Sequence, residues 1–102
     1  MSEEEAYFNR VGEAINGGQK SQMFGKPCYK IGKKAFVCFF EHSMVFKLSG
    51  EVHKMAMSLE GVHLFDPSGK SRPMKEWVQV PFESKDKWVE FAKEAADYVA
   101  GN

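Results

Sequence analysis

The side chains that most often perform catalysis or bind metals are spread along this sequence without a recognised spacing. Its three histidines, His42, His53 and His63, stand 11 and 10 residues apart, so no two of them have the short separation that lets imidazoles share a metal ion. The serines lie outside a Gly-x-Ser-x-Gly elbow, and the glycines form neither a dinucleotide-binding motif nor a phosphate loop. We therefore predict no catalytic, cofactor-binding or metal-binding residue, and a protein that is not an enzyme.

Two cysteines, Cys28 and Cys38, flank a predicted β-hairpin whose turn contains Gly32. A three-residue turn would place the two thiols directly opposite each other, whereas a two-residue turn would place them on opposite faces. The sequence leaves both registers open. Because there are only two cysteines and no zinc-binding spacing, we expect reduced thiols in a cytoplasmic protein. A thiol-dependent or small-ligand function is the third of three functional hypotheses.

Lysines are concentrated in one segment, although the formal net charge is zero. Residues 14–40 contain five lysines and no acidic residue, and a second basic run at 70–75 precedes Trp77. Such runs produce a local positive field, but lysines also protect sheet edges from aggregation. The candidate surface for a protein partner or for nucleic acid consists of Lys26, Lys30, Lys33, Lys34, Arg72 and Trp77.

The hydrophobic pattern predicts a small α+β fold. Helices are expected where apolar residues recur at helical spacing between a capping residue and a glycine, namely from Ser2 to Gly17, from Ser49 to Gly61 and from Ser84 to Gly101. Ser2 and Glu5 form a capping-box pattern. Strands are expected at 23–31, 35–40, 44–48, 62–65 and 75–80. The order α-β-β-β-α-β-β-α predicts an antiparallel sheet with helices packed on it. In the last helix the expected apolar stripe consists of Trp88, Phe91, Ala92, Ala95 and Val99.

Length and composition limit the class of protein. A chain of 102 residues has the usual size of one domain, so residues 1–102 are expected to fold as a single unit. The longest apolar run, 35–40, is far shorter than the about 20 residues that span a membrane. The first residues are acidic, unlike those of a signal or transit peptide. We expect a cytoplasmic protein of bacterial type that does not enter a membrane.

Several short motifs resemble the N-terminal domain of the TfoX (Sxy) competence-regulator family and, more distantly, the YjbR-like proteins. They begin with Met23-Phe24-Gly25 and with Gly32-Lys33 followed by Phe36. They continue with Val-Phe-Lys-Leu at 45–48, with Arg-Pro-Met at 72–74 leading into Trp-Val-Gln-Val-Pro at 77–81, and with Trp88 and Ala92 in the last helix. The resemblance runs from about Gln22 to Val99. One departure is Lys26-Pro27, where the family usually has a further glycine and a small residue.

The resemblance implies a compact α+β domain of undefined biochemical role, the TfoX-N-like domain. We expect a regulatory or protein-interaction module with an unidentified protein partner and no cofactor. The alternative is weak nucleic-acid binding through the basic hairpin from Lys20 to Lys34. Clustered lysines flanked by aromatic residues would favour nucleic acid, whereas an exposed aromatic patch without focused charge would favour a protein partner.

Overall fold

The computed structural model describes residues 2–23, 25–66 and 73–101. In this part of the chain there are three α-helices, and the 3-10 helix η1 (Phe82–Lys87) leads into the last of them. The α-helices are α1 (Glu3–Ala14), α2 (Gly50–Met57) and α3 (Trp88–Ala100). The strands are β1 (Gly18–Met23), β2 (Lys26–Ile31), β3 (Lys34–Phe40), β4 (Ser43–Lys47), β5 (His63–Phe65) and β6 (Met74–Val80). The structure confirms the predicted α+β class, with helices packed on an antiparallel sheet.

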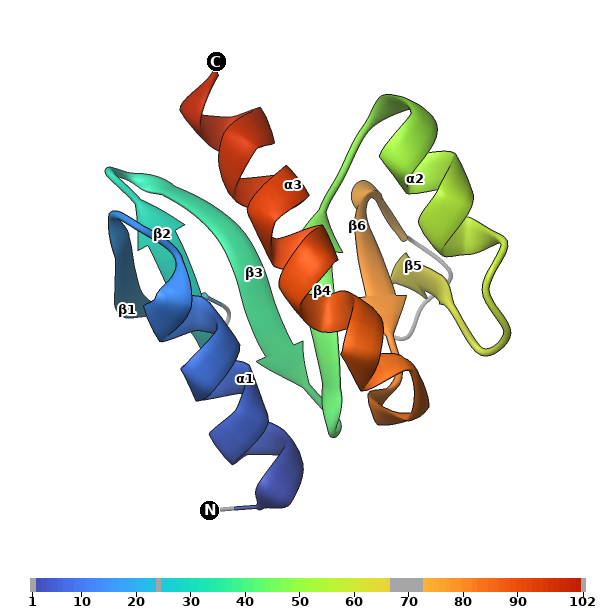
Figure 1. The fold of residues 1–102 in the computed structure, drawn as a ribbon, viewed down its shortest axis with the longest axis horizontal. Coiled ribbons are helices and arrows are strands. Elements are labelled where there is room, and N and C mark those ends of the chain that lie inside the picture. The colour runs from blue at the N-terminus through green and yellow to red at the C-terminus, as the bar shows by residue number, and fades with distance from the viewer. Residues whose placement is uncertain (1, 24, 67–72, 102) are drawn as a thin grey trace.

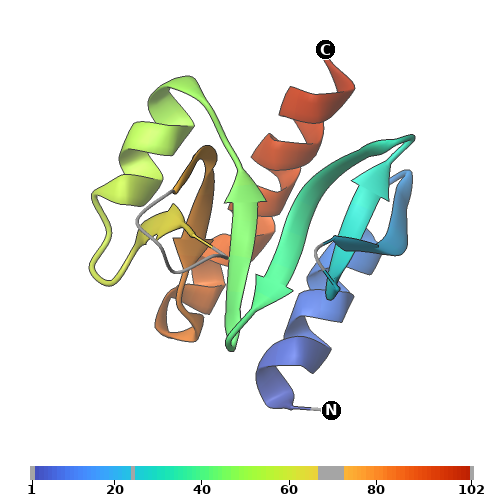
Figure 2. The ribbon, with the colours of Figure 1, turned by 180° about the vertical axis from the view of Figure 1, so that it is seen from behind.

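The strands form one antiparallel sheet in the order β1-β2-β3-β4-β6-β5. Helices α1 and α3 lie across one face of the sheet, and α2 lies beside β6 (Figure 1). Seen from behind, the strands stand in front of α1 and α3, and none of the described helices crosses them on that side (Figure 2). We call the side covered by α1 and α3 the helix face and the other side the back face.

Strand β1 has no counterpart among the strands predicted from the hydrophobic pattern. Its sequence, Gly-Gln-Lys-Ser-Gln-Met, has no apolar alternation. It forms because β2 offers a complete partner, from Gly18 opposite Ile31 to Met23 opposite Lys26. Pro27 is tolerated within β2 because the pairing of β2 with β3 begins only at the next residue, so the missing N–H costs no bond to β3.

The turn between β2 and β3 has two residues, Gly32 and Lys33, and Ile31 pairs with Lys34 across it. A two-residue turn is the commonest connection in a β-hairpin. If this register continued along the whole hairpin, the two cysteines would point to opposite faces of the sheet.

A β-bulge changes that outcome. The register of β2 against β3 shifts between Tyr29 and Lys30, which inserts one extra residue into β3. Beyond the shift, Cys28 pairs directly with Cys38, and both thiols lie on the back face. The hairpin therefore combines the shorter of the two predicted turns with the cysteine pairing expected for the longer one.

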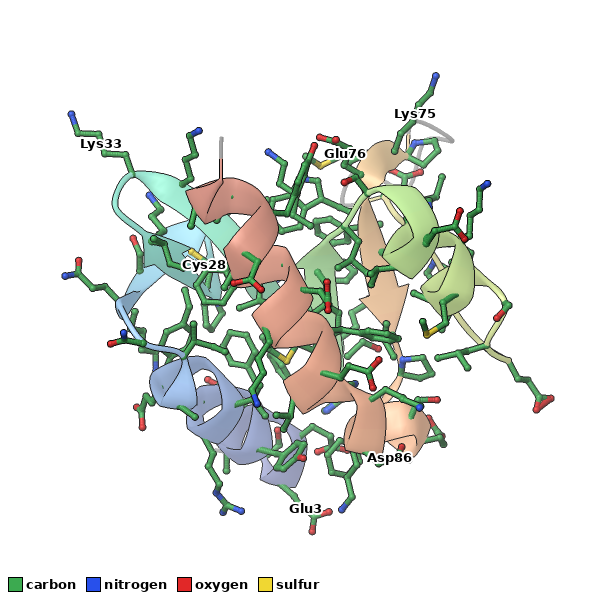
Figure 3. The ribbon with its side chains drawn as sticks, turned by 45° about the horizontal axis from the view of Figure 1, so that its top comes forward. Glu3, Cys28, Lys33, Lys75, Glu76 and Asp86 are labelled. Atoms are coloured by element: carbon green, nitrogen blue, oxygen red, sulfur yellow. The ribbon has the colours of Figure 1, made fainter. Side chains whose placement is uncertain are left out.

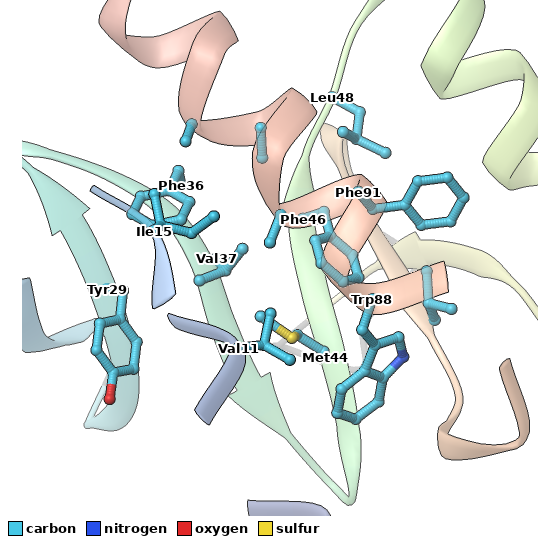
Figure 4. Close-up of a cluster of buried hydrophobic side chains, with 14 of the residues drawn as sticks. Val11, Ile15, Tyr29, Phe36, Val37, Met44, Phe46, Leu48, Trp88 and Phe91 are labelled. Atoms are coloured by element: carbon cyan, nitrogen blue, oxygen red, sulfur yellow. The ribbon is translucent and has the colours of Figure 1, made fainter. Parts of the chain in front are cut away.

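The main hydrophobic core lies between the sheet and helices α1 and α3 (Figure 4). Phe91 of α3 meets Phe46 of β4 edge to face, with ring centroids 5.7 Å apart. Helix α3 begins at Trp88. Ser84, which the sequence predicts as the cap of this helix, lies instead inside η1 and has a non-helical backbone. The predicted apolar stripe is confirmed, since its members are all buried: Trp88, Phe91, Ala92, Ala95 and Val99.

A second, smaller apolar cluster lies on the back face. Phe65 of β5 packs edge to face against Phe40 of β3, with ring centroids 5.1 Å apart. Met23, at the end of β1, is half-buried against this cluster. Its buried members are Cys28, Cys38, Val45, Phe65 and Trp77.

Candidate functional site

The lysines of the candidate surface do not converge on one patch. Lys26 and Lys30 project from the back face of β2, because they alternate with Tyr29, which packs in the helix-face core. Lys33 lies in the hairpin turn and extends away from the body of the molecule (Figure 3). Lys34 is the first residue of β3. These charges therefore occupy different sides of one hairpin.

The second basic run does not extend this surface. Arg72 lies outside the described residues. Lys75 belongs to β6, which β3 and β4 separate from β2, and Figure 3 shows Lys33 and Lys75 on opposite flanks. Trp77 lies on the back face, but it is only 7% exposed and packs in the back-face cluster. It is therefore not available as a surface aromatic for recognition, which corrects its inclusion in the candidate surface.

Lys26 is directed away from the edge of the sheet. Its Nζ lies 5.5 Å from the centroid of the Phe40 ring in β3, within the range of a cation–π contact. Nucleic-acid binding needs several cations along one surface, and single strands also need exposed rings for base stacking. The positions of these side chains give that activity little support.

The edge of the sheet formed by β1 is a stronger candidate. β1 is an end strand with six residues, and its pairing with β2 has no register shift. The opposite end strand, β5, has only three residues and is shifted in register against β6. A long regular edge is a template for another strand, whereas a short irregular edge is protected from such pairing.

Two observations indicate which backbone groups of β1 face outward. Along an antiparallel strand, residues alternate between bonding their neighbour and pointing away from it. Gln22 pairs with Pro27, which has no N–H to donate. The N–H of Gly18 donates to the carbonyl oxygen of Ile15 at 3.0 Å. Both facts indicate that the backbone N–H and C=O groups of Gly18 and Gln22 point away from β2. Because every second residue points the same way, those of Lys20 also point away from β2.

The side chains of β1 are polar and leave this edge accessible. Gln19, Lys20 and Gln22 are exposed, and Ser21 is half-buried. Their polarity explains why hydrophobic periodicity does not reveal the strand. One weak sign of a strand remains in the sequence. Residues 19–24 form a stretch without proline between Gly17-Gly18, which follow the first helix, and Gly25, which precedes the apolar hairpin.

The surface hollows of the described residues contain polar side chains, but each of these is exposed or half-buried. A hollow of about 260 Å³ lies between the start of α2 and α3, and at its rim Tyr98 donates a hydrogen bond to Glu76. Another, of about 500 Å³, lies between the ends of α1 and α3, and its lining is mostly small or apolar: Ala14, Ile15, Asn16, Ile31, Lys93, Ala96, Asp97 and Ala100. Neither lining contains a buried ionisable side chain, the feature that would point to an active site.

The two thiols are free and buried. Burial raises the pKa of Cys28, although the nearby charge of Lys30 opposes the effect. Burial, reinforced by the neighbouring Cys28, raises the pKa of Cys38 to about 12. Because the thiolate is the reactive form, this environment does not support thiol chemistry.

The described part of the chain was also searched for metal sites and membrane-spanning helices. It contains no group of three or more His, Cys, Asp and Glu side chains placed to hold a metal ion. No helix within it is long and apolar enough to cross a membrane. Comparisons with protein-family models, curated proteins and solved structures find no match to this chain. The resemblance to the TfoX N-terminal domain therefore stays a prediction.

Proposed function

We propose that this protein is a non-catalytic interaction module that binds an extended segment of a partner protein as an additional strand along β1. The observation that carries the proposal is the regular six-residue edge of β1, with outward-facing backbone groups at Lys20 and Gln22. In this mode of binding, main-chain hydrogen bonds supply affinity and the alternating side chains of the added strand supply specificity.

A regulatory role in the cytoplasm suits this mode of binding. Strand addition needs only a short extended segment of the partner, so that one module can bind a segment that is exposed under one condition and hidden under another. The two unpaired thiols, Cys28 and Cys38, fit a reducing compartment. A regulatory role is also compatible with the TfoX-like motifs, Met23 with Gly25 and Gly32 with Lys33.

Weak nucleic-acid binding is the second candidate. It is favoured by the five lysines between residues 14 and 40, where no acidic residue occurs. It is disfavoured by the division of Lys30 and Lys33 between the back face and the hairpin turn, and by the burial of Trp77. Titration with short single-stranded and duplex DNA separates this candidate from strand addition.

A neutral heptapeptide of alternating Thr and Gln, blocked at both ends, tests strand addition without relying on charge. Titrated into ¹⁵N-labelled protein, it should shift the amide signals of β1, above all those of Lys20 and Gln22, and slow their hydrogen exchange. The same peptide N-methylated at three successive central residues has lost donors on both of its edges and should shift none of them. Shifts confined to β5 or to the hollows, or equal shifts with the methylated peptide, would overturn the proposal.

Substitutions at Gln22 provide a matched test in the protein. Gln22→Pro removes an outward N–H at an edge position where proline is tolerated, so the variant should melt normally and no longer bind the heptapeptide. Gln22→Ala removes the side chain but keeps the N–H, and should bind like the wild type. Unchanged binding by a folded Gln22→Pro protein would show that the β1 backbone is not the site.

A further inference from the structure

We infer that the segment that adds to β1 is acidic, with carboxylate side chains that pair with Lys20, Lys30 and Lys33, a conclusion that rests on the proposed function. We call these three residues the edge lysines. They lie on β1 itself, on its neighbour β2 and in the turn at the end of β2. Their placement selects the chemistry of the partner, whereas the open backbone of β1 selects only its extended conformation.

Lys20 lies closest to an added strand. It is exposed, and it pairs with Tyr29, whose side chain packs in the helix-face core, so Lys20 projects from the helix face. Neighbouring strands lie about 4.8 Å apart. A carboxylate on the helix face of the added strand would therefore stand beside the Lys20 side chain.

Lys30 and Lys33 cover the other face and one end of the same edge. Lys30 projects from the back face of β2, where its cross-strand neighbour in β1 is Gln19. An added strand would lie about 10 Å from β2, a gap that an extended lysine and a glutamate can bridge together. Lys33 lies in the turn next to Ile31, which pairs with Gly18 at the start of β1.

Few acidic groups near β1 offset these charges. No Asp or Glu occurs between Glu13 and Glu41. Two carboxylates of the helices lie near this edge, fewer than the three edge lysines: Glu13 accepts a hydrogen bond from the Tyr29 hydroxyl at 3.4 Å, and Asp97 of α3 lines the hollow that Ile31 also lines. We leave Lys26 out of the set because its ammonium group lies over Phe40. The β1 edge thus has a positive field that an acidic segment complements.

The distribution of the edge lysines favours a protein strand over nucleic acid. Lys20 projects from the helix face and Lys30 from the back face. A β-strand also directs its successive side chains to opposite faces, so an acidic strand presents carboxylates to both lysines at once. A phosphate backbone that followed one face would leave the other lysine without a partner.

Two matched heptapeptides test the inference: Thr-Glu-Glu-Thr-Glu-Glu-Thr, which places glutamates on both faces of an extended strand, and the same peptide with Gln at each Glu position. At about 0.05 M salt the Glu peptide should bind about fivefold more tightly, as expected for two or three exposed ion pairs. The difference should disappear near 0.5 M salt, where screening shortens the range of surface charges. Changing the edge lysines together to Gln should abolish the preference for Glu. The control Lys54→Gln, at an exposed position in α2, should keep it.

Each outcome has a separate meaning. Equal affinity for the two peptides at low salt, with shifts in β1, would overturn the acidic partner and leave the proposed function intact. Failure of both peptides to shift β1 would overturn both. Binding of DNA at the edge lysines that displaces the Glu peptide would assign these charges to phosphates and overturn the inference. A concentration-dependent dimer that Gln22→Pro disrupts would assign the edge to a second copy of the chain and overturn it too.

Discussion

Gly12 of α1 lies so close to Tyr29 of β2 that a Cβ at residue 12 would stand 2.4 Å from Cδ1 of the tyrosine ring. Both residues are buried. One helical turn before Gly12, Oδ1 of Asn9 accepts a hydrogen bond from the Tyr29 hydroxyl at 3.0 Å. The ring and the hydroxyl of one residue therefore fix α1 on the sheet, beside the β1 edge.

Gly12→Ala should lower the free energy of unfolding by about 1–3 kcal/mol. The added methyl group overlaps the Tyr29 ring and forces it or the helix to move, and the helix-propensity gain of about 1 kcal/mol only partly offsets this. Denaturant melts measure the effect. In a protein that also carries Tyr29→Ala, Gly12→Ala should leave the free energy of unfolding unchanged or raise it. An equal cost in both backgrounds would show that the ring is not the cause.

Stability should decline at alkaline pH, in part because of Tyr29. Burial, reinforced by the charge of Glu13 and its hydrogen bond, raises the pKa of Tyr29 from 10.0 to about 12. Above pH 10 the unfolded chain loses this proton while the folded chain keeps it. The contribution to the free energy of unfolding is therefore complete below pH 10 and is lost as the pH rises toward 12.

Urea melts across that pH range, on the wild type and on Tyr29→Phe, check this expectation. The variant should be less stable at neutral pH, because Asn9 loses a hydrogen bond, but its stability should fall less steeply with pH. Cys38, whose pKa is also raised, is present in both proteins and cancels in the comparison. Parallel declines in the two proteins would contradict the assignment to Tyr29.

Both thiols should be slow to react in the folded protein. Cys28 and Cys38 are at most 1% exposed, and burial raises the pKa of each. A thiol reagent at neutral pH should label them at least about a hundredfold more slowly than in denaturant, since labelling requires opening of the structure. Cys28→Ala and Cys38→Ala assign the rates to single sites. Rapid labelling of either thiol in the folded state would restore the thiol-dependent hypothesis.

The turn between β2 and β3 and the turn between β3 and β4 should respond to substitution with opposite signs. Glu41 and His42, between β3 and β4, have φ values of +47° and +67°, which Asn and Gly adopt at lower cost. Glu41→Asn with His42→Gly should therefore stabilise the protein by about 1 kcal/mol. Nδ1 of His42 lies 3.7 Å from Oε1 of Glu4, but the histidine side chain is largely exposed, so the loss of this contact costs little.

Gly32→Ala, in the turn between β2 and β3, is the matched control. Gly32 has a φ of +61°, and a Cβ there would meet no atom within 4 Å, so only backbone strain acts. Thermal melts should show a loss of about 1 kcal/mol. A loss of stability in the Glu41 and His42 double variant would mean that contacts of these side chains, rather than their backbone conformation, dominate that turn.

Features that depend on residues a few positions apart could be predicted from the sequence. Ser2 caps α1 as its capping box indicates, because its Oγ accepts the N–H of Glu5 at 3.1 Å. The stripe that contains Trp88 and Phe91 faces the sheet because helical periodicity alone gathers these residues on one side. Strand alternation also predicts that Lys26 and Lys30 share one face of their strand and that Lys33 and Lys34 lie in the turn. The structure agrees for Lys26, Lys30 and Lys33, whereas Lys34 is the first residue of β3.

Features that depend on a neighbouring strand were decided by the tertiary structure. Trp77 alternates with Val78 as predicted, yet it is buried because the back face has an apolar cluster of its own. Cys28 meets Cys38 because a bulge, which no turn residue encodes, shifts the register.

The amino-acid sequence by itself determined the class of fold, the helix-facing core and the excess of lysine near the hairpin. It did not determine the binding edge proposed here. The polar segment Gly18–Met23 becomes a strand only because β2 satisfies its backbone. It becomes an accessible edge only because no other strand of the described residues pairs with its outer side. Backbone pairing of this kind depends on which groups remain unbonded in the assembled sheet, a property that side-chain pattern does not encode.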